Sequence, residues 1–210
     1  MYSKLNKKGY KVLSFIVISV IKSVRKEIII ITLLFLSSLY LGYYVANLYP
    51  NLAYKVFDEL LSQFKFVRVL PSPLLFLFIF INNSIKILLT MLLGVMFGII
   101  PLLFIIINGF MVGIVFYVSN MKIGTWTTIM LIIPHGVIEI PALILGCSYG
   151  LWLGKMLIWK MRGKEVSIVD CIKHIINQYI KIIIPMLIVA ALVETYVTPF
   201  ISNIIKYIVK

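Results

Sequence analysis

The longest uncharged stretch limits what this chain can fold into more than any other feature. Residues 87–121 contain no charged side chain. As one straight helix this stretch would be about 52 Å long, whereas the hydrocarbon core of a bilayer is about 30 Å thick. The stretch must therefore fold back on itself. Pro101 is the expected break, because proline is favoured in the first turn of a helix and disfavoured deeper inside it. The sequence thus predicts two membrane spans, 84–100 and 101–119, joined by a tight turn.

The composition agrees with a membrane environment. Of the 210 residues 62% are hydrophobic and 13% are charged, and the mean hydropathy is +1.09. A soluble domain is about half apolar and a quarter charged, so a soluble enzyme is excluded. Neither a disordered nor a disulfide-rich class fits these counts, because the only cysteines are Cys147 and Cys171, one in an apolar run and one beside a basic segment.

Three further apolar runs predict spans at 28–47, 135–157 and 178–197. The segments between the spans are shorter or amphipathic. We expect an interfacial helix within 48–72, short interfacial or re-entrant pieces at 73–81 and 125–133, and a surface helix at 165–177. The predicted fold class is therefore all-α: a polytopic integral membrane helix bundle with about five transmembrane helices plus short interfacial or re-entrant helices. One transmembrane domain, 27–197, follows a basic N-terminal arm, 1–26, and precedes an amphipathic tail, 198–210.

The positive charge indicates orientation rather than nucleic acid binding. The formal net charge is +13, but the basic residues lie between apolar runs and not over one polar face. A five-span order returns the basic cluster at 155–164 to the side of the N-terminal cluster, as the positive-inside rule requires. The sequence therefore predicts a multi-pass cell-membrane protein with a cytoplasmic N-terminus and anionic headgroups as lipid partners. The N-terminal cluster consists of Lys4, Lys7, Lys8, Lys11, Lys22, Arg25 and Lys26.

Glycines recur at a spacing of four residues in three of the predicted spans. At helical pitch such glycines line one stripe, where the missing side chain lets another helix approach closely. We therefore expect a tightly packed bundle. The glycines are Gly94 and Gly98, then Gly109 and Gly113, then Gly146, Gly150 and Gly154.

Three asparagines and one acidic motif are the polar candidates within apolar surroundings. Asn82, Asn83 and Asn108 must find hydrogen-bond partners, so they either cross-link helices or contact a polar substrate or ion. His135 and Glu139 are four residues apart and share one helix face. They can form a structural pair, handle a proton or ligand, or hold a metal; a single histidine with a single glutamate is a poor zinc site. The other histidine, His174, belongs to the basic surface segment.

The sequence shows no motif of soluble-type catalysis. It has no glycine-rich phosphate loop and no zinc-protease motif, and its only adjacent carboxylates, Asp58 and Glu59, lie in an amphipathic stretch. We therefore predict no catalytic residue, no metal and no cofactor.

Four elements follow one another in the sequence: Ile81-Asn82-Asn83, Gly94 to Pro101, Asn108-Gly109 with Gly113, and Pro134-His135-Gly136 with Glu139 to Ala142 and Gly146. Together they resemble the stage II sporulation protein M family of integral membrane proteins, in its archaeal-type branch. The resemblance covers about 72–158. It implies candidate positions at Asn83, Asn108, Gly109, His135 and Glu139, to which the motif adds Gly136. In spore-forming bacteria the namesake is a multi-span scaffold that gathers peptidoglycan hydrolases during engulfment; relatives occur in organisms without spores, so this role does not transfer automatically.

The leading hypothesis is a non-enzymatic membrane scaffold or assembly component with a membrane or envelope protein as partner. Its ligand- or partner-binding candidates are Asn83, Asn108, Gly109, His135, Gly136 and Glu139. A second hypothesis is a small transporter or permease-like subunit, in which Asn83, Asn108, His135 and Glu139 line a polar path. A third is an intramembrane enzyme with His135 and Glu139 as acid–base pair. No nucleic acid partner is predicted, and a homo-oligomer stays open.

Overall fold

The chain forms an all-α bundle. The computed structural model describes residues 24–63 and 70–199, with 63 and 132–135 described by their backbone only. These residues contain seven α-helices and no strand. Five helical segments are long and apolar enough to cross a membrane, so the predicted fold class is confirmed. They are Arg25–Leu48, Ser72–Val95, Ile99–Ile123, Gly136–Met161 and Ile168–Val197.

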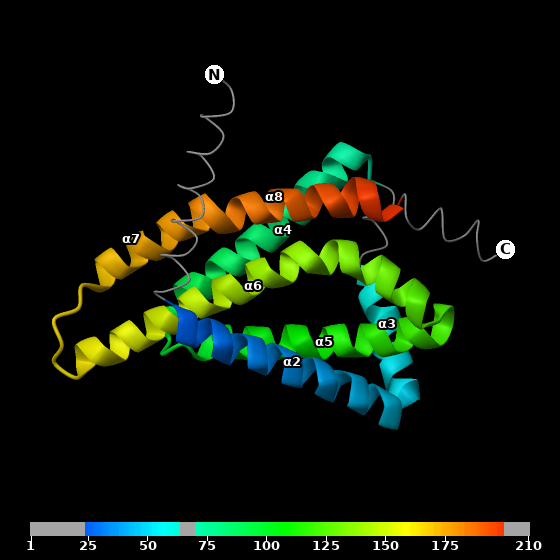
Figure 1. Cartoon of the computed structure of the whole chain (residues 1–210), viewed down its shortest axis with the longest axis horizontal. Coiled ribbons are helices and arrows are strands. Elements are labelled where there is room, and N and C mark those ends of the chain that lie inside the picture. The colour runs from blue at the N-terminus through cyan, green and yellow to red at the C-terminus, as the bar shows by residue number, and fades with distance from the viewer. Residues whose placement is uncertain (1–23, 64–69, 200–210) are drawn as a thin grey trace, which may run out of the picture.

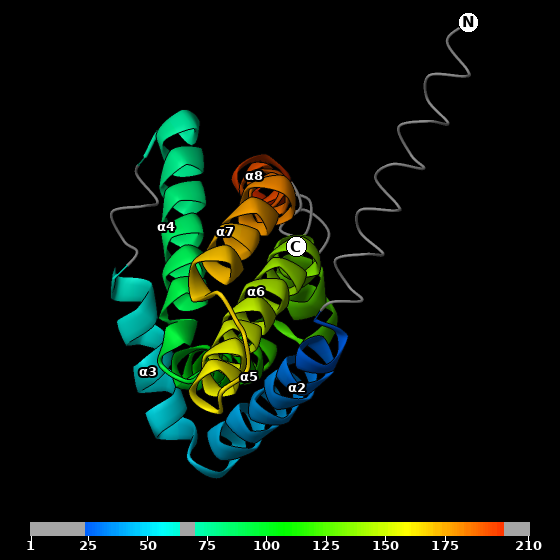
Figure 2. The ribbon, with the colours of Figure 1, turned by 90° about the vertical axis from the view of Figure 1, so that its left-hand side faces the viewer.

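The long helices run lengthwise beside one another (Figure 1). Helix α2 packs chiefly on α5, and α6 lies between α5 and the pair formed by α4 and α8 (Figure 2). The elements in chain order are α2 (Arg25–Leu48), α3 (Pro50–Gln63), α4 (Ser72–Leu92), the short turn η2 (Leu93–Val95), α5 (Ile99–Ile123), α6 (Thr125–Met161), α7 (Ile168–Gln178), the π-helical η3 (Tyr179–Ile183), α8 (Ile184–Leu192) and the π-helical η4 (Val193–Val197).

The predicted amphipathic helix after the first span is α3. Its Ala53 is buried against Tyr117 and Val118 of α5 and Ala46 of α2, and Phe57 packs on the same cluster. The apolar side of α3 thus closes one end of the bundle.

The predicted tight turn between α4 and α5 lies at 96–98, just before Pro101. Phe97 and Gly98 both adopt positive φ angles, 56° and 77°. Glycine suits this left-handed conformation, whereas Phe97 is strained in it. Pro101 occupies the first turn of α5, where its missing N–H costs no hydrogen bond.

Two predicted helix breaks are wrong. Helix α4 is continuous from Ser72 through Asn82 and Asn83, so 73–81 is no separate piece and the span does not begin at 84. Helix α6 is continuous through Pro134, so 125–133 is its first part. Asparagine disfavours a helix only weakly, and a proline inside a long helix can kink it without ending it. Figure 1 shows α6 changing direction along its length.

The predicted surface helix at 165–177 is also not separate from the last span. Ser167 caps α7 by accepting a hydrogen bond from the Asp170 N–H, and the helix then continues to Val197. The two π-helical segments, η3 and η4, end two residues before Pro185 and Pro199. A proline ring collides with the carbonyl four residues earlier in an α-helix, and the wider π turn avoids that collision. The predicted arm and tail lie almost entirely outside the described residues.

The expectation from the glycine spacing is confirmed on two helix interfaces. A methyl group added at Gly42 or Gly113 would collide with the backbone of the facing helix, at Phe110 and Leu39, so α2 and α5 touch through their main chains. Gly94 meets Gly150 on α6, and Gly154 meets the turn at Gly98 in the same manner. Any side chain at these positions would separate the helices.

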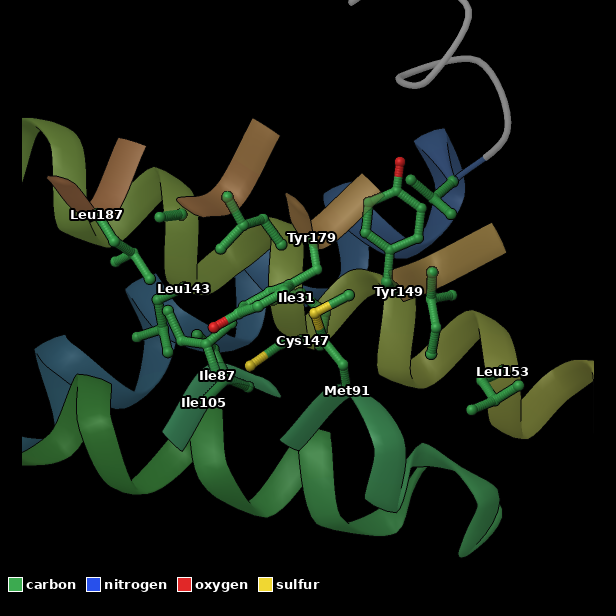
Figure 3. Packing of buried hydrophobic residues seen from close by; sticks show 14 of the residues in the cluster. Ile31, Ile87, Met91, Ile105, Leu143, Cys147, Tyr149, Leu153, Tyr179 and Leu187 are labelled. Carbon is green, nitrogen blue, oxygen red and sulfur yellow. The ribbon is translucent and has the colours of Figure 1, made fainter. Parts of the chain in front are cut away.

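The main core lies where these interfaces meet. Figure 3 shows Ile87 and Met91 of α4, Ile105 of α5 and Cys147 of α6 around one centre, with Ile31, Tyr179 and Leu187 closing it. All of these side chains are buried.

We predict that Gly42→Leu destabilises the fold by at least about 1–3 kcal/mol, because overpacking forces the α2 and α5 backbones apart. Thermal unfolding in detergent measures the change. The matched control is Ser37→Leu, which adds the same side chain on the exposed face of α2. Equal melting temperatures for the two variants would contradict the close α2–α5 contact.

Candidate functional site

The first asparagine element lies where α4 meets the last helix. The Asn82 Nδ2 donates to Asn83 Oδ1 at 3.5 Å, and both side chains are partly buried. The next residue, Ser84, is buried, and its carbonyl accepts a hydrogen bond from the Tyr179 hydroxyl at 2.9 Å. Figure 3 shows the Tyr179 ring reaching into the core toward Ile87. This turn of α4 is therefore bonded along its own helix and tied to η3.

The second asparagine element lies on another interface. The Asn108 Nδ2 donates to the Phe104 carbonyl of the same helix at 2.7 Å. Gly109 is buried beside Ser38 of α2, where a methyl group would collide with the Ser38 hydroxyl. Asn108 thus satisfies its amide locally, and Gly109 provides the space for α2.

The Pro134–Pro141 element is fully helical. Gly136 is buried and Glu139 is partly buried. Positions 135 and 139 lie one turn apart on one helix, as expected, but the His135 side chain lies outside the described residues. The pairing of His135 with Glu139 therefore stays a prediction.

The described contacts do not bring the asparagine elements to one point. Ser84, next to Asn83, contacts η3, whereas Gly109 contacts α2. Among the described residues no group of three or more His, Cys, Asp or Glu side chains is placed to hold a metal ion.

An ion pair joins Glu27 to Lys155 and was not predicted from the sequence. Glu27 lies in the first turn of α2 and is buried, and the Lys155 ammonium of α6 donates to its Oε1. The Lys155 ammonium also lies 5.3 Å from the centre of the Trp159 ring. The positive end of the α2 dipole further favours an acid in this first turn. The sequence contained one signal for Glu27: it is the only acid before residue 58, and it directly precedes a predicted span.

His174 is less exposed than predicted. It is partly buried between two rings of α6, with centroid distances of 6.2 Å to Tyr149 and 5.6 Å to Trp152. The amphipathic α7 therefore packs on α6 rather than lying free at the surface.

We predict that Glu27→Gln lowers stability in detergent by about 3 kcal/mol, because it leaves the Lys155 charge without its partner. This is the lower end of the range for buried pairs, since the Lys155 side chain is 37% exposed. The double variant Glu27→Gln, Lys155→Met should recover most of the loss, since it removes both charges. Additive losses in this double-mutant cycle would contradict the pair.

The chain is a polytopic α-helical membrane protein by its five long apolar helices. Contacts between glycines and the backbone of facing helices hold its bundle together. The sequence profile of Stage II sporulation protein M matches residues 31–199. The chain therefore belongs to the stage II sporulation protein M family. The match extends the resemblance seen in the sequence to α2 and to the last helix.

Two archaeal proteins are similar to the chain over most of its length. Both are proteins of Methanocaldococcus jannaschii that are described as uncharacterized. One is 28% identical over 188 residues, covering 83% of this chain and 96% of the relative. The other is 31% identical over 190 residues, covering 86% of this chain and 85% of the relative. No solved structure gives a significant match.

Proposed function

We propose that this protein is a non-enzymatic scaffold or assembly component of a membrane complex. The observation that supports this best is the main-chain contact between helices at glycine, with Gly94 against Gly150 and Gly109 against α2. Such contacts favour one fixed arrangement of the spans, since a packed interface is not continuously deformable. Family membership adds support through the scaffold role of the namesake.

The polar candidates fit an internal role in this proposal. The described hydrogen bonds of Asn83 and Asn108 lie within their own helices. In the proposal, His135, Gly136 and Glu139 shape the first half of α6 for a partner protein. A transporter needs Asn83, Asn108, His135 and Glu139 along one path. The separation of the Asn83 and Gly109 elements between two interfaces favours the scaffold.

The proposed environment is the cell membrane with the N-terminus in the cytoplasm. The Glu27–Lys155 pair joins the start of α2 to the end of α6, so the described basic residues beside them share one end of the bundle. The other end is more balanced, since Lys122 pairs with Asp58 at 3.4 Å and lies over the Phe57 ring. By the positive-inside rule the first end faces the cytoplasm and its anionic headgroups. The residues at this end include Arg25, Lys26, Lys160, Arg162 and Lys164.

We predict that a membrane-impermeant maleimide labels Asp58→Cys from outside intact cells, whereas Arg162→Cys is labelled only after permeabilisation. Both positions are exposed. The variants are made in a Cys171→Ser background; Cys147 is buried and stays. That background alone must give no label. Labelling of Arg162→Cys in intact cells would contradict the orientation.

We predict that crosslinking in native membranes, followed by affinity capture, recovers the same membrane or envelope protein in independent preparations. An equally tagged, unrelated five-span protein is the control. Recovery of no specific partner, or of additional copies of this chain alone, would contradict the assembly function.

A further inference from the structure

Two exposed lysines lie well inside spans and form no ion pair among the described residues: Lys181 of η3 and Lys86 of α4. Only Lys86 has two asparagines one turn before it on its own helix, which distinguishes it from Lys181. Lys86 of α4 is nine residues before Val95, or about 13 Å of helix, and further still from Ser72. The position of the neighbouring helix α6 indicates the same depth for Lys86. Gly146 of α6 contacts Ile87, and Lys155, the next charged residue of α6, is nine residues beyond Gly146. Lys86 therefore lies well inside the hydrocarbon region.

The Lys86 side chain is exposed, and within the described chain it makes no ion pair. The backbone carbonyl of Lys86 accepts a hydrogen bond from the Thr90 hydroxyl at 2.8 Å, but the Lys86 ammonium is not involved. Helix α4 lies at the edge of the bundle (Figure 2), and Ile85 and Leu89 beside Lys86 are exposed apolar residues. An ammonium on such a surface is costly in lipid.

Lipid headgroups are a poor partner for this lysine. A lysine near the end of a span can extend its side chain to the headgroups, which is called snorkelling. Lys86 is far from both ends of its span. Its Cα–Cβ bond is tilted toward the N-terminus of α4, which is the more distant end. The side chain therefore starts in the wrong direction to reach the nearer headgroups.

A second copy of the chain is also a poor partner. The described acids within the spans are Glu27, Glu139, Asp170 and Glu194. Glu27 is buried with Lys155, Glu139 and Glu194 are partly buried with contacts of their own, and Asp170 pairs with Lys173 near the start of the last helix. None of them presents a free carboxylate at the depth of Lys86.

We propose that the face of α4 formed by Asn82, Asn83, Ile85, Lys86 and Leu89, here called the Lys86 face, binds a transmembrane helix of a different membrane protein, which presents an aspartate or glutamate to Lys86. The two amides precede Lys86 by four and three residues, so they lie one turn away on the same side of the helix. They can donate further hydrogen bonds to the carboxylate. The inference rests on the proposed assembly function and specifies its partner by charge and depth.

A defined probe tests the charge pairing. A synthetic Leu/Ala transmembrane peptide of about 20 residues bears one central glutamate and a photoactivatable group; its matched control has glutamine instead. In phosphatidylcholine vesicles the glutamate peptide should crosslink to the wild-type protein about tenfold more than the glutamine peptide. Lys86→Met should abolish the difference, Lys86→Arg should retain it, and Lys160→Met, at the exposed end of α6, should not affect it. Unfolding in detergent confirms that each variant is folded.

Equal crosslinking of the two peptides, or an undiminished difference in Lys86→Met, overturns the inference. The inference is also overturned if added phosphatidylglycerol abolishes crosslinking of the glutamate peptide, because a lipid phosphate would then occupy the site.

A photocrosslinker at Leu89 in native membranes gives the second readout, and Leu36, which is exposed on α2, serves as its control position. A partner recovered equally with wild type and Lys86→Met contradicts only this inference, whereas no partner at all contradicts the proposed function.

Discussion

Direct contact between helix backbones at glycine is the interaction on which this bundle depends. Lipid tails are as apolar as leucine, so no hydrophobic effect drives helices together inside a bilayer, and close packing must do so. Gly42 and Gly113 bring α2 onto α5, while Gly94 and Gly150 bring α4 onto α6. The turn at Gly98 then packs on Gly154. Helix α6 thereby holds both arms of the α4–α5 hairpin, which explains how strained Phe97 is retained in the turn.

The glycine spacing predicted these contacts because periodicity alone places the residues on one stripe. The errors concerned where helices end. Asn82 to Ser84 and Pro134 are signals that end helices in water, where an exposed peptide group can bond to solvent. In lipid every backbone group must be satisfied inside the protein, so the helices continue through both signals and bend or widen instead. The π-helical turns before Pro185 and Pro199 are the same response.

The candidate site was predicted less completely than the fold, since its partners are distant in sequence. Spacing placed Glu139 one turn from His135, and the continuous helix agrees with that. Nothing in the sequence linked Ser84 to Tyr179, or Glu27 to Lys155, which are separated by 95 and 128 residues. These contacts follow from the order in which the helices pack, and that order is set by the glycine interfaces.

The charged side chains of the bundle differ in where their counterions come from. Where a charge is enclosed, as at Glu27, the chain provides its own counterion and closes the end of α2 on α6. Where a charge meets the surface outside the membrane, as at Lys122, an acid and two aromatic rings of α3 surround it. Lys86 follows neither rule, since it lies between exposed Ile85 and Leu89 with two asparagines one turn away and no acid of the described chain beside it. Lys181 in the last helix is likewise exposed and forms no ion pair among the described residues. Glu27 and Lys122 thus have their counterions within the chain, whereas the counterion of Lys86 is the one that the proposed partner helix would supply.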